Sequence, residues 1–238
     1  MSIRNFRFVC ATKVHRSRFV SDTALGRSLT KLAQSNYGVL LFDENSLGLS
    51  VVYNRAIEMA KDDPAILIFL HDDVYIADIF WQDTIISGLR QFDIVGLAGN
   101  KTRIGNQASW DALDETGLKA ASEELSGGIV WGHELQSGTV QYFGPTGQAV
   151  KILDGVFLAC SSKLLVESGL RFDEKFRFHF YDVDFCREAE MRNIRMGTVP
   201  ITTCHMGSNT FGTTLWKDGY DKYRRKWGDP ECQTSFIS

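Results

Sequence analysis

One unbroken apolar run, Ala65–Leu70, is followed at once by His71, Asp72 and Asp73, and it constrains the fold more than any other feature of the chain. Six consecutive apolar residues of this kind are typical of a central strand in a parallel sheet, where both faces of the strand are covered. Such sheets bind their ligands beyond the carboxyl ends of their strands. The run therefore predicts a buried central strand with the chemistry of the protein directly after it.

Strand and helix patterns alternate on either side of this run. Strands are expected at 6–12, 39–42, 65–70, 93–98, 150–159 and 197–204, and helices at 23–32, 49–60, 80–89 and 182–193. Asp182 is placed to cap the last of these helices, and residues 13–22 read as a loop. Alternating strands and helices predict a doubly wound α/β fold, a mostly parallel sheet flanked by helices.

The whole chain, 1–238, is expected to form a single domain, because its length fits one large α/β unit. Within it, about 100–147 is predicted to be an irregular insert containing a hairpin, and about 209–238 a C-terminal extension.

Composition narrows the class of protein. Hydrophobic residues make up 44% and charged residues 23%, as in ordinary globular proteins, and the net charge of -3 gives no overall attraction to nucleic acid. The five cysteines are scattered, without a paired spacing, and no apolar stretch has the length of a membrane span. The start of the chain does not read as a secretory signal. We therefore expect a cytoplasmic protein without a transmembrane segment.

Three groups of residues could carry chemistry. The first is His71-Asp72-Asp73, whose side chains suit Mg²⁺ or Mn²⁺ with positions left open for phosphate oxygens, although a solvated turn is the alternative. The second is Asp182 and Asp184 in an aromatic segment, where either a helix cap or a general base fits. The third is His205 after the last strand, which gains weight as a ligand only if the first group binds a metal.

Taken in order, these segments resemble family 2 glycosyltransferases of the GT-A type. The resemblance rests on five stretches that keep the family's order, between about Phe6 and Ser208. They are Asn45–Ile57, Phe69–Val74, Leu153–Phe157, Phe172–Arg187 and Gly197–His205. The His-Asp-Asp-Val tetrad, where the family usually has an Asp-x-Asp strand end, is closest to a bacterial subgroup related to a streptomycin-biosynthesis glycosyltransferase-like family.

The resemblance implies roles for the residues that match on the donor side. Asp73 would contact a divalent cation, Mn²⁺ or Mg²⁺, that bridges the donor diphosphate, with His71 and His205 as further metal ligands. His71 stands where the family has aspartate. The residues implied for donor binding are Thr12, Asp43, Asn54, Asp72 and Asp73.

On the acceptor side, the resemblance implies Asp154, Gly155 and Tyr181 for binding, and Asp182 and Asp184 for catalysis. Asp182 is expected to be the general base, ionised near neutral pH, and Asp184 to be mainly structural or to orient the acceptor. Tyr181 replaces the family's glutamate.

The expected function is metal-assisted transfer of a sugar from a nucleotide-sugar donor to an acceptor hydroxyl, with inversion, in bacterial surface polysaccharide or glycoconjugate synthesis. The expected partners are the donor and a carbohydrate or glycoconjugate acceptor. A catalytically silent nucleotide- or sugar-binding domain is the alternative. A sugar-nucleotide pyrophosphorylase fits less well, because no glycine-rich basic loop follows the first strand.

Overall fold

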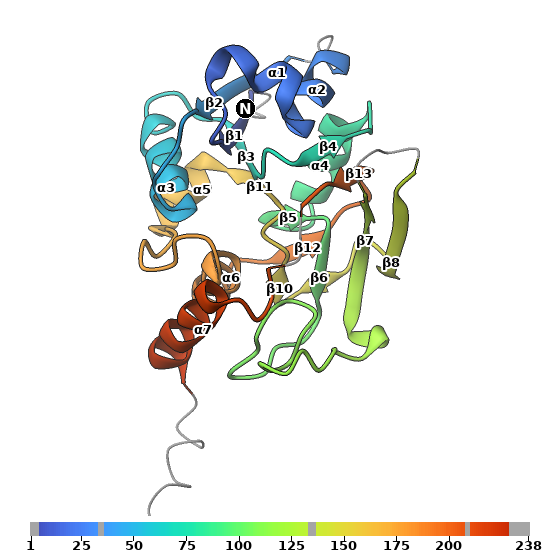
Figure 1. Ribbon diagram of the computed structural model, residues 1–238, viewed down its shortest axis with the longest axis vertical. Coiled ribbons are helices and arrows are strands. Elements are labelled where there is room, and N and C mark those ends of the chain that lie inside the picture. The colour runs from blue at the N-terminus through green and yellow to red at the C-terminus, as the bar shows by residue number, and fades with distance from the viewer. Residues whose placement is uncertain (1–4, 33–35, 133–136, 208–209, 229–238) are drawn as a thin grey trace, which may run out of the picture.

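The computed structural model describes residues 5–32, 36–132, 137–207 and 210–228. Ser208, at the end of the family resemblance, and residues 229–238 of the expected C-terminal extension, with Cys232, lie outside them. A seven-stranded sheet forms the centre of the molecule, in the order β2-β1-β3-β11-β5-β12-β9 (Figure 1). Its strands are β1 (Phe6–Ala11), β2 (Gly38–Phe42), β3 (Ile66–Leu70), β5 (Ile94–Gly96), β9 (Ala149–Val150), β11 (Phe157–Ser161) and β12 (Met196–Thr198).

The predicted central strand is confirmed. All five residues of β3 are buried, and the strand pairs with β1 on one side and β11 on the other. Phe69 packs against Tyr53 on one face of the sheet, while Phe8, in the neighbouring β1, packs against Trp81 on the other. Apolar residues therefore follow one another without interruption in β3 because both of its faces lie in the core.

The α/β fold class is confirmed, but the sheet is mixed rather than mostly parallel. β1 is parallel to β2 and β3, and β5 is parallel to β12, whereas β11 is antiparallel to both of its neighbours and β9 is antiparallel to β12. A parallel strand needs a long crossover connection. β11 is entered through the short 154–156 connection, with no crossover helix directly before it, and it runs the opposite way.

A second sheet packs beside the first, in the order β10-β6-β7-β13-β4. Its strands are β4 (Val74–Ile76), β6 (Ala98–Asn100), β7 (Leu125–Trp131), β10 (Ile152–Leu153) and β13 (Thr203–His205), and β8 (Thr139–Gly144) pairs with β7. The expected hairpin is thus confirmed as β7–β8, but β7 is a middle strand of this sheet and not part of an irregular insert.

Three stretches that read as single strands each divide between the two sheets. The 93–98 stretch gives β5 and the start of β6, the 150–159 stretch gives parts of β9, β10 and β11, and the 197–204 stretch gives β12 and β13. In the first stretch both strands and Leu97 between them are buried, so its apolar pattern does not show the passage from one sheet to the other. In the other two, exposed residues separate the strands: Lys151 lies between β9 and β10, and Pro200 and Thr202 lie between β12 and β13.

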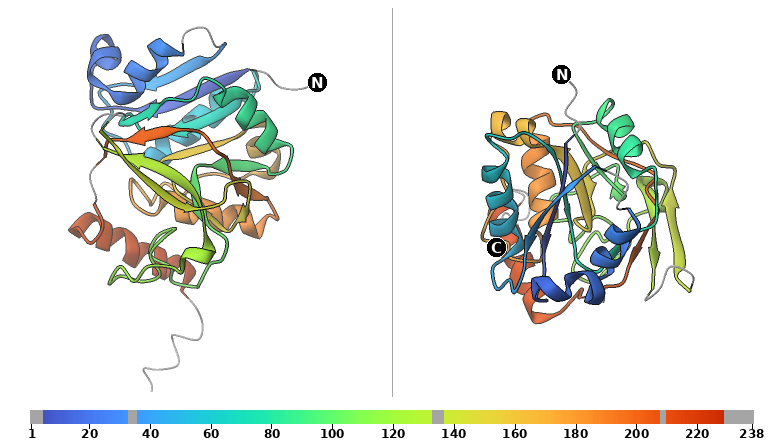
Figure 2. Two further views of the ribbon diagram at one scale, coloured as in Figure 1. Left: turned by 90° about the vertical axis from the view of Figure 1, so that its right-hand side faces the viewer. Right: turned by 90° about the horizontal axis from the view of Figure 1, so that it is seen from above.

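The helices flank the central sheet (Figures 1 and 2). α3 (Leu49–Met59), α5 (Ser162–Ser168) and α6 (Tyr181–Met191) lie on one face, and α4 (Trp81–Leu89) lies on the other. The expected 13–22 loop contains η1 (Arg16–Arg18) and α1 (Phe19–Asp22), and α2 (Ala24–Lys31) follows. The remaining helices are η2 (Ser122–Glu124) and α7 (Thr214–Trp227), and α7 packs beside the start of α6.

Asp182 does not cap α6, contrary to the sequence-based expectation. Phe180 occupies the N-cap position, with a left-handed backbone (φ 64°), and Asp182 lies in the first helical turn. Phe180 is held there by stacking on Tyr220 and Tyr223 of α7, which compensates for the uncommon backbone conformation. The carboxylate of Asp182 is therefore available for contacts outside its own helix.

One hydrophobic cluster runs from Phe6 in β1 to Tyr223 in α7. The cysteines at 10, 160, 186 and 204 are free and buried within the described chain. Within the described part of the chain, the helices are too short or too polar to span a membrane.

Candidate active site

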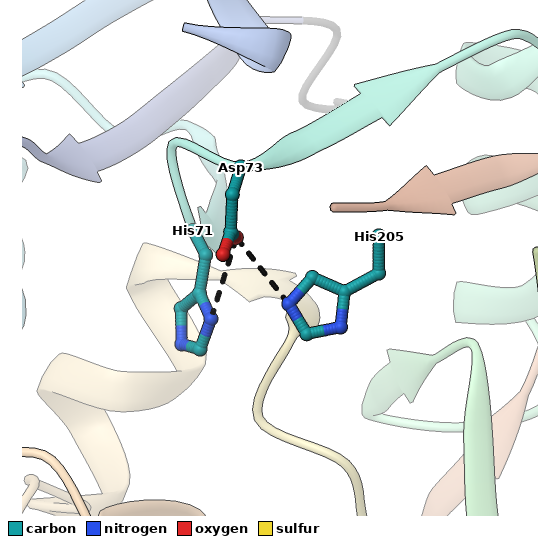
Figure 3. A group of neighbouring side chains, drawn as sticks. All are labelled: His71, Asp73 and His205. Carbon is teal, nitrogen blue, oxygen red and sulfur yellow. Dashed lines mark ion pairs between the residues drawn. The ribbon is translucent and has the colours of Figure 1, made fainter. Parts of the chain in front are cut away.

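Three side chains that follow or precede strands meet in one cluster: His71, Asp73 and His205 (Figure 3). His71 follows β3, Asp73 precedes β4, and His205 ends β13. β13 pairs antiparallel with β4 so that His205 is opposite Val74, and the Met206 amide donates to the Asp73 carbonyl at 2.9 Å. This register places His205, at the end of β13, beside Asp73, which precedes β4.

The geometry of the cluster suits a divalent cation. Asp73 Oδ1 lies 3.3 Å from His205 Nε2 and 3.9 Å from His71 Nδ1, and one possible ligand atom from each residue lies within 4.8 Å of the others. A Cβ at Gly207 would come within 2.5 Å of His205 Nε2 and 2.7 Å of Asp73 Oδ2, so glycine leaves open the space that these atoms face. Two imidazoles and a carboxylate match the ligands of Mn²⁺ and leave further positions open.

The hydrogen bonds around Tyr181 set the orientation of the His71 ring. The Tyr181 hydroxyl donates to the Gly155 carbonyl at 2.8 Å and lies 2.9 Å from His71 Nε2. Because the hydroxyl proton is used on Gly155, the hydroxyl oxygen accepts from Nε2–H, and the lone pair of Nδ1 points toward Asp73. Burial lowers the pKa of His71 to about 4 even though Asp73 favours the charged ring. The ring is therefore neutral near pH 7, as a metal ligand must be.

In Asp73 the effect of the neighbouring residues on the pKa outweighs that of burial. Burial by itself would raise the pKa of this carboxyl group, but His205 and His71 lower it below its ordinary value. Asp73 is therefore an anionic ligand over the physiological pH range.

A pair of carboxyl groups, Asp154 and Asp182, lines the same cleft as the His71, Asp73 and His205 cluster. The Gly155 amide donates to Asp182 Oδ2 at 3.0 Å, and Asp154 Oδ1 accepts from the Val156 amide at 3.1 Å. Burial, followed by the nearby charge of Asp182, raises the pKa of Asp154 to about 7. Burial also raises the pKa of Asp182, against the backbone amides at the start of α6. Desolvation thus outweighs the helix terminus, which was expected to dominate.

Both clusters open into one cleft of about 670 Å³. Its walls come from the ends of β3 and β13, the 154–156 connection, the start of α6, the loop before β7, and the start of α7. Two aromatic rings flank the histidines: Phe178 stacks on His71 at 5.7 Å, and Trp131 contacts His205 at 4.6 Å. The antiparallel pairing of Phe157 with Leu70 is what brings the 154–156 connection next to His71.

Three of the residues expected to bind the donor, Thr12, Asp43 and Asp72, lie at the carboxyl ends of β1, β2 and β3. Thr12 donates its hydroxyl to Asp72 Oδ2 at 2.6 Å, and burial raises the pKa of Asp72. Asp43 accepts from the Arg16 amide at 3.0 Å and pairs with its guanidinium at 3.2 Å. These three residues share one edge of the sheet with the metal cluster but do not line the 670 Å³ cleft.

Two expected site residues do not line the cleft: Asn54, expected to bind the donor, and Asp184, expected to be mainly structural or acceptor-orienting. Asn54 bonds both the carbonyl and the amide of Phe172, at 2.9 and 3.0 Å, and so fixes the chain before α6 rather than facing the cleft. Asp184 is fully buried and accepts from Trp227 Nε1 at 2.6 Å and Lys226 Nζ at 2.8 Å. Successive helical residues point in different directions, which turns Asp184 toward α7 while Asp182 faces the cleft.

Several cleft residues escaped the sequence analysis. Trp131 is adjacent to His205 only through the parallel pairing of β7 with β13. Trp110, Asp111 and Lys119 reach the cleft from a stretch without a clear secondary-structure pattern. Phe178 belongs to the aromatic segment before α6, and this clustering was the one signal available.

Two solved structures share this fold. The crystal structure of GalNAc-T7 with UDP, GalNAc and Mn²⁺ superposes with a TM-score of 0.51 and 12% identity, over 94% of this chain and 48% of that one. This chain thus spans about half of GalNAc-T7. The catalytic domain of Drosophila beta1,4galactosyltransferase 7, in complex with xylobiose, gives a TM-score of 0.51 and 8% identity, over 92% and 80% of the two chains. At these identities the likeness establishes the fold.

The sequence itself identifies the family. No curated protein sequence matches the chain. Residues 39–227 match the sequence model described as "Glycosyltransferase like family". This range includes the His71, Asp73 and His205 cluster and the Asp154–Asp182 pair, and it ends with α7. The chain therefore belongs to the glycosyltransferase-like family, and it is an enzyme with the GT-A fold.

Proposed function

We propose that the protein transfers a sugar from a nucleotide-sugar donor to an acceptor hydroxyl with the assistance of Mn²⁺ or Mg²⁺. The observation that carries the proposal is the position of Asp182 in the same cleft as His71, Asp73 and His205. The reaction needs both groups: a cation against the leaving diphosphate and a base for the attacking hydroxyl. GalNAc-T7, with the same fold, was crystallised with UDP and Mn²⁺, which supports this class of donor and cofactor.

His71 Nδ1, Asp73 and His205 Nε2 would hold the cation, which when bound neutralises negative charge that develops on the diphosphate. The donor nucleoside is assigned to the edge formed by Thr12, Asp43 and Asp72. Thr12 and Asp43 are held in place there by hydrogen bonds at the ends of β1 and β2. The diphosphate then extends from this edge toward Asp73.

Asp182 is the proposed general base, and the Gly155 amide fixes its orientation. Asp154, Gly155 and Tyr181 border the place where the acceptor hydroxyl would lie. A single base that takes the proton of the attacking hydroxyl fits inversion at the sugar carbon. The resemblance to the bacterial subgroup supports a role in bacterial surface polysaccharide or glycoconjugate synthesis. The cytoplasm remains the proposed compartment, since the cysteines show no paired spacing.

The test is release of nucleoside diphosphate from a panel of uridine, guanosine and thymidine diphosphate sugars, with Mn²⁺, Mg²⁺ or EDTA. We expect metal-dependent turnover that falls about 10²–10⁴-fold in Asp182→Asn while nucleotide affinity is kept. Asp218→Asn, which removes an exposed acid of α7, is the matched control. Binding of nucleotide without turnover in the wild type would instead indicate a silent binding domain, in which the exchanges at His71 and Tyr181 have removed the chemistry.

A further inference from the structure

The cleft is lined by more acidic side chains than lysines or arginines. Its lining includes four carboxylates, Asp73, Asp111, Asp154 and Asp182. Among the described residues that line it, Lys119 is the one lysine or arginine, and it already pairs with Asp111 at 2.5 Å. The other basic side chains among these residues are the imidazoles of His71, His179 and His205, and His71 and His205 would be neutral as ligands of the cation.

The excess of negative charge falls on the side where the acceptor would bind. A divalent cation on Asp73 would be matched by the charge of the donor diphosphate. This leaves Asp182, and Asp154 at pH values above its pKa of about 7, without a compensating cation. Asp111 and Lys119 offset one another. An acceptor with its own negative group near the accepting hydroxyl would meet these carboxylates in a partly desolvated cleft, where like charges repel strongly.

The same part of the cleft offers apolar and hydroxyl-binding surface. Phe143 meets Trp110 edge to face at 4.7 Å, and Phe178 exposes 48% of its surface beside His71. Asp111 also accepts from the Ser109 hydroxyl at 2.7 Å and so presents a fixed carboxylate to a ligand hydroxyl. Aromatic walls with a few oriented polar groups are typical of sites for neutral, hydroxyl-rich ligands.

We propose that this enzyme takes uncharged carbohydrate acceptors and rejects acceptors that carry carboxylate, sulfate or phosphate near the accepting hydroxyl. The inference rests on the proposed function, because it assumes that the acceptor enters this cleft beside Asp182. Specificity of this kind comes from a repulsive element as well as from attractive contacts.

The test uses an array of neutral oligosaccharides of glucose, galactose, mannose, xylose and N-acetylglucosamine, together with their glucuronylated, sialylated, sulfated and phosphorylated counterparts. The full-length protein is applied with Mn²⁺ and whichever of UDP, GDP or dTDP it binds. We expect neutral members to be retained and each acidic counterpart to bind at least about ten-fold more weakly at low ionic strength. The difference should narrow as salt is added.

Two variants that change the charge of the cleft in opposite directions sharpen the test. Asp111→Asn leaves Lys119 without its partner and should increase retention of acidic glycans several-fold, whereas Lys119→Gln should decrease it further. Glu115→Gln removes a charge from the same loop but outside the cleft, and should change neither. Mn²⁺-dependent nucleotide binding in each variant shows whether it is folded.

Equal or stronger retention of the acidic glycans would overturn the inference, and so would retention of no glycan by protein that still binds nucleotide with Mn²⁺. If the wild type binds no nucleotide, this result contradicts the proposed function itself, and the inference with it.

Discussion

At the scale of single residues, the orientation of His71 depends on a side chain more than a hundred positions away. Tyr181 OH uses its proton on Gly155 and leaves its oxygen for His71 Nε2. Tyr181 stands where the family was expected to have glutamate, and its hydroxyl supplies the outer hydrogen bond that fixes the tautomer of a metal-binding histidine. The exchanges at 71 and 181 are thus connected by a direct contact, which neither motif reveals alone.

Gly207 gives a direct test of where the cation binds. In Gly207→Ala the new Cβ would lie 2.5 Å from His205 Nε2 and 2.7 Å from Asp73 Oδ2. We expect Mn²⁺ affinity to fall about 10–100-fold, the range found when ligands lose their fixed orientation. Calorimetric titration with Mn²⁺ measures it, with Gly38→Ala as control, since a Cβ there meets its nearest neighbour at an ordinary 3.5 Å. An unchanged Mn²⁺ affinity in Gly207→Ala would show that the cation does not bind in this space.

Asp154 predicts how stability depends on pH. Its pKa is about 7 in the folded protein, above the ordinary value of 3.8, mainly because of burial. The folded state therefore holds this proton more tightly, so the contribution of Asp154 to stability is present below about pH 4 and is lost as the pH rises to about 7.

Asp154→Asn removes this loss and can still accept from the Val156 amide. We expect the variant to gain about 1–3 kcal/mol over the wild type at pH 8 and little at pH 4. Urea denaturation at the two pH values measures the gain. A variant that is less stable than the wild type at pH 8 would rule out this account.

At the scale of helices and strands, α6 carries Asp182 and is held from behind by α7. Lys226 of α7 bonds Asp184 at 2.8 Å, Asp173 at 2.9 Å and Glu188 at 3.1 Å. These acids raise the pKa of Lys226 to about 12, although burial by itself would lower it, and burial raises the pKa of Asp184 to about 6. The C-terminal helix therefore supports the start of α6 through a buried charge.

Lys226→Met should destabilise the protein by about 2–3 kcal/mol at pH 8, because it leaves the Asp184 charge buried without a partner. The loss should shrink at pH 5, where Asp184 takes up a proton. Lys222→Met is the control, since Lys222 pairs with Asp218 on the exposed side of α7 and should cost at most about 0.5 kcal/mol. Equal losses in the two variants, measured by urea denaturation, would contradict the role given to Lys226.

Elements could be predicted where one physical signal dominates. The apolar run of β3 and the helical spacing of α3 appear in the structure near the expected residues, because each buries a continuous surface. The passage from β5 to β6 could not be predicted, since both strands and Leu97 between them are buried. Between β12 and β13, the exposed Pro200 and Thr202 do mark a break. Strand direction was missed at β11 because the sequence does not show which short connections replace a crossover.

At the scale of the whole molecule, the site is assembled by strand pairing. The sequence could place His71, Asp73 and His205 beyond strand ends, and the structure brings them together through the β4–β13 register. It could not place Trp131, which depends on the pairing of β7 with β13, or Lys119, which lies in an irregular loop. Motifs at strand ends are therefore predictable, whereas the walls of a cleft built from loops are not.

The expectation of a single domain is testable at the same scale. One hydrophobic cluster includes residues from both sheets and from α7, so we expect one cooperative unfolding transition. Tryptophan fluorescence and far-ultraviolet circular dichroism should give coincident urea curves. Two separated transitions would contradict the single-domain assignment.

The most direct test of the central claim is calorimetric titration of nucleoside diphosphate into protein with Mn²⁺, comparing wild type with Asp73→Asn. Asp73 lies between the two histidines, and the substitution removes its charge while nearly keeping its shape. The account predicts Mn²⁺-dependent binding of UDP, GDP or dTDP by the wild type, and a loss of at least about ten-fold in the folded variant. Binding that does not need the metal, or that is unchanged in Asp73→Asn, would contradict it.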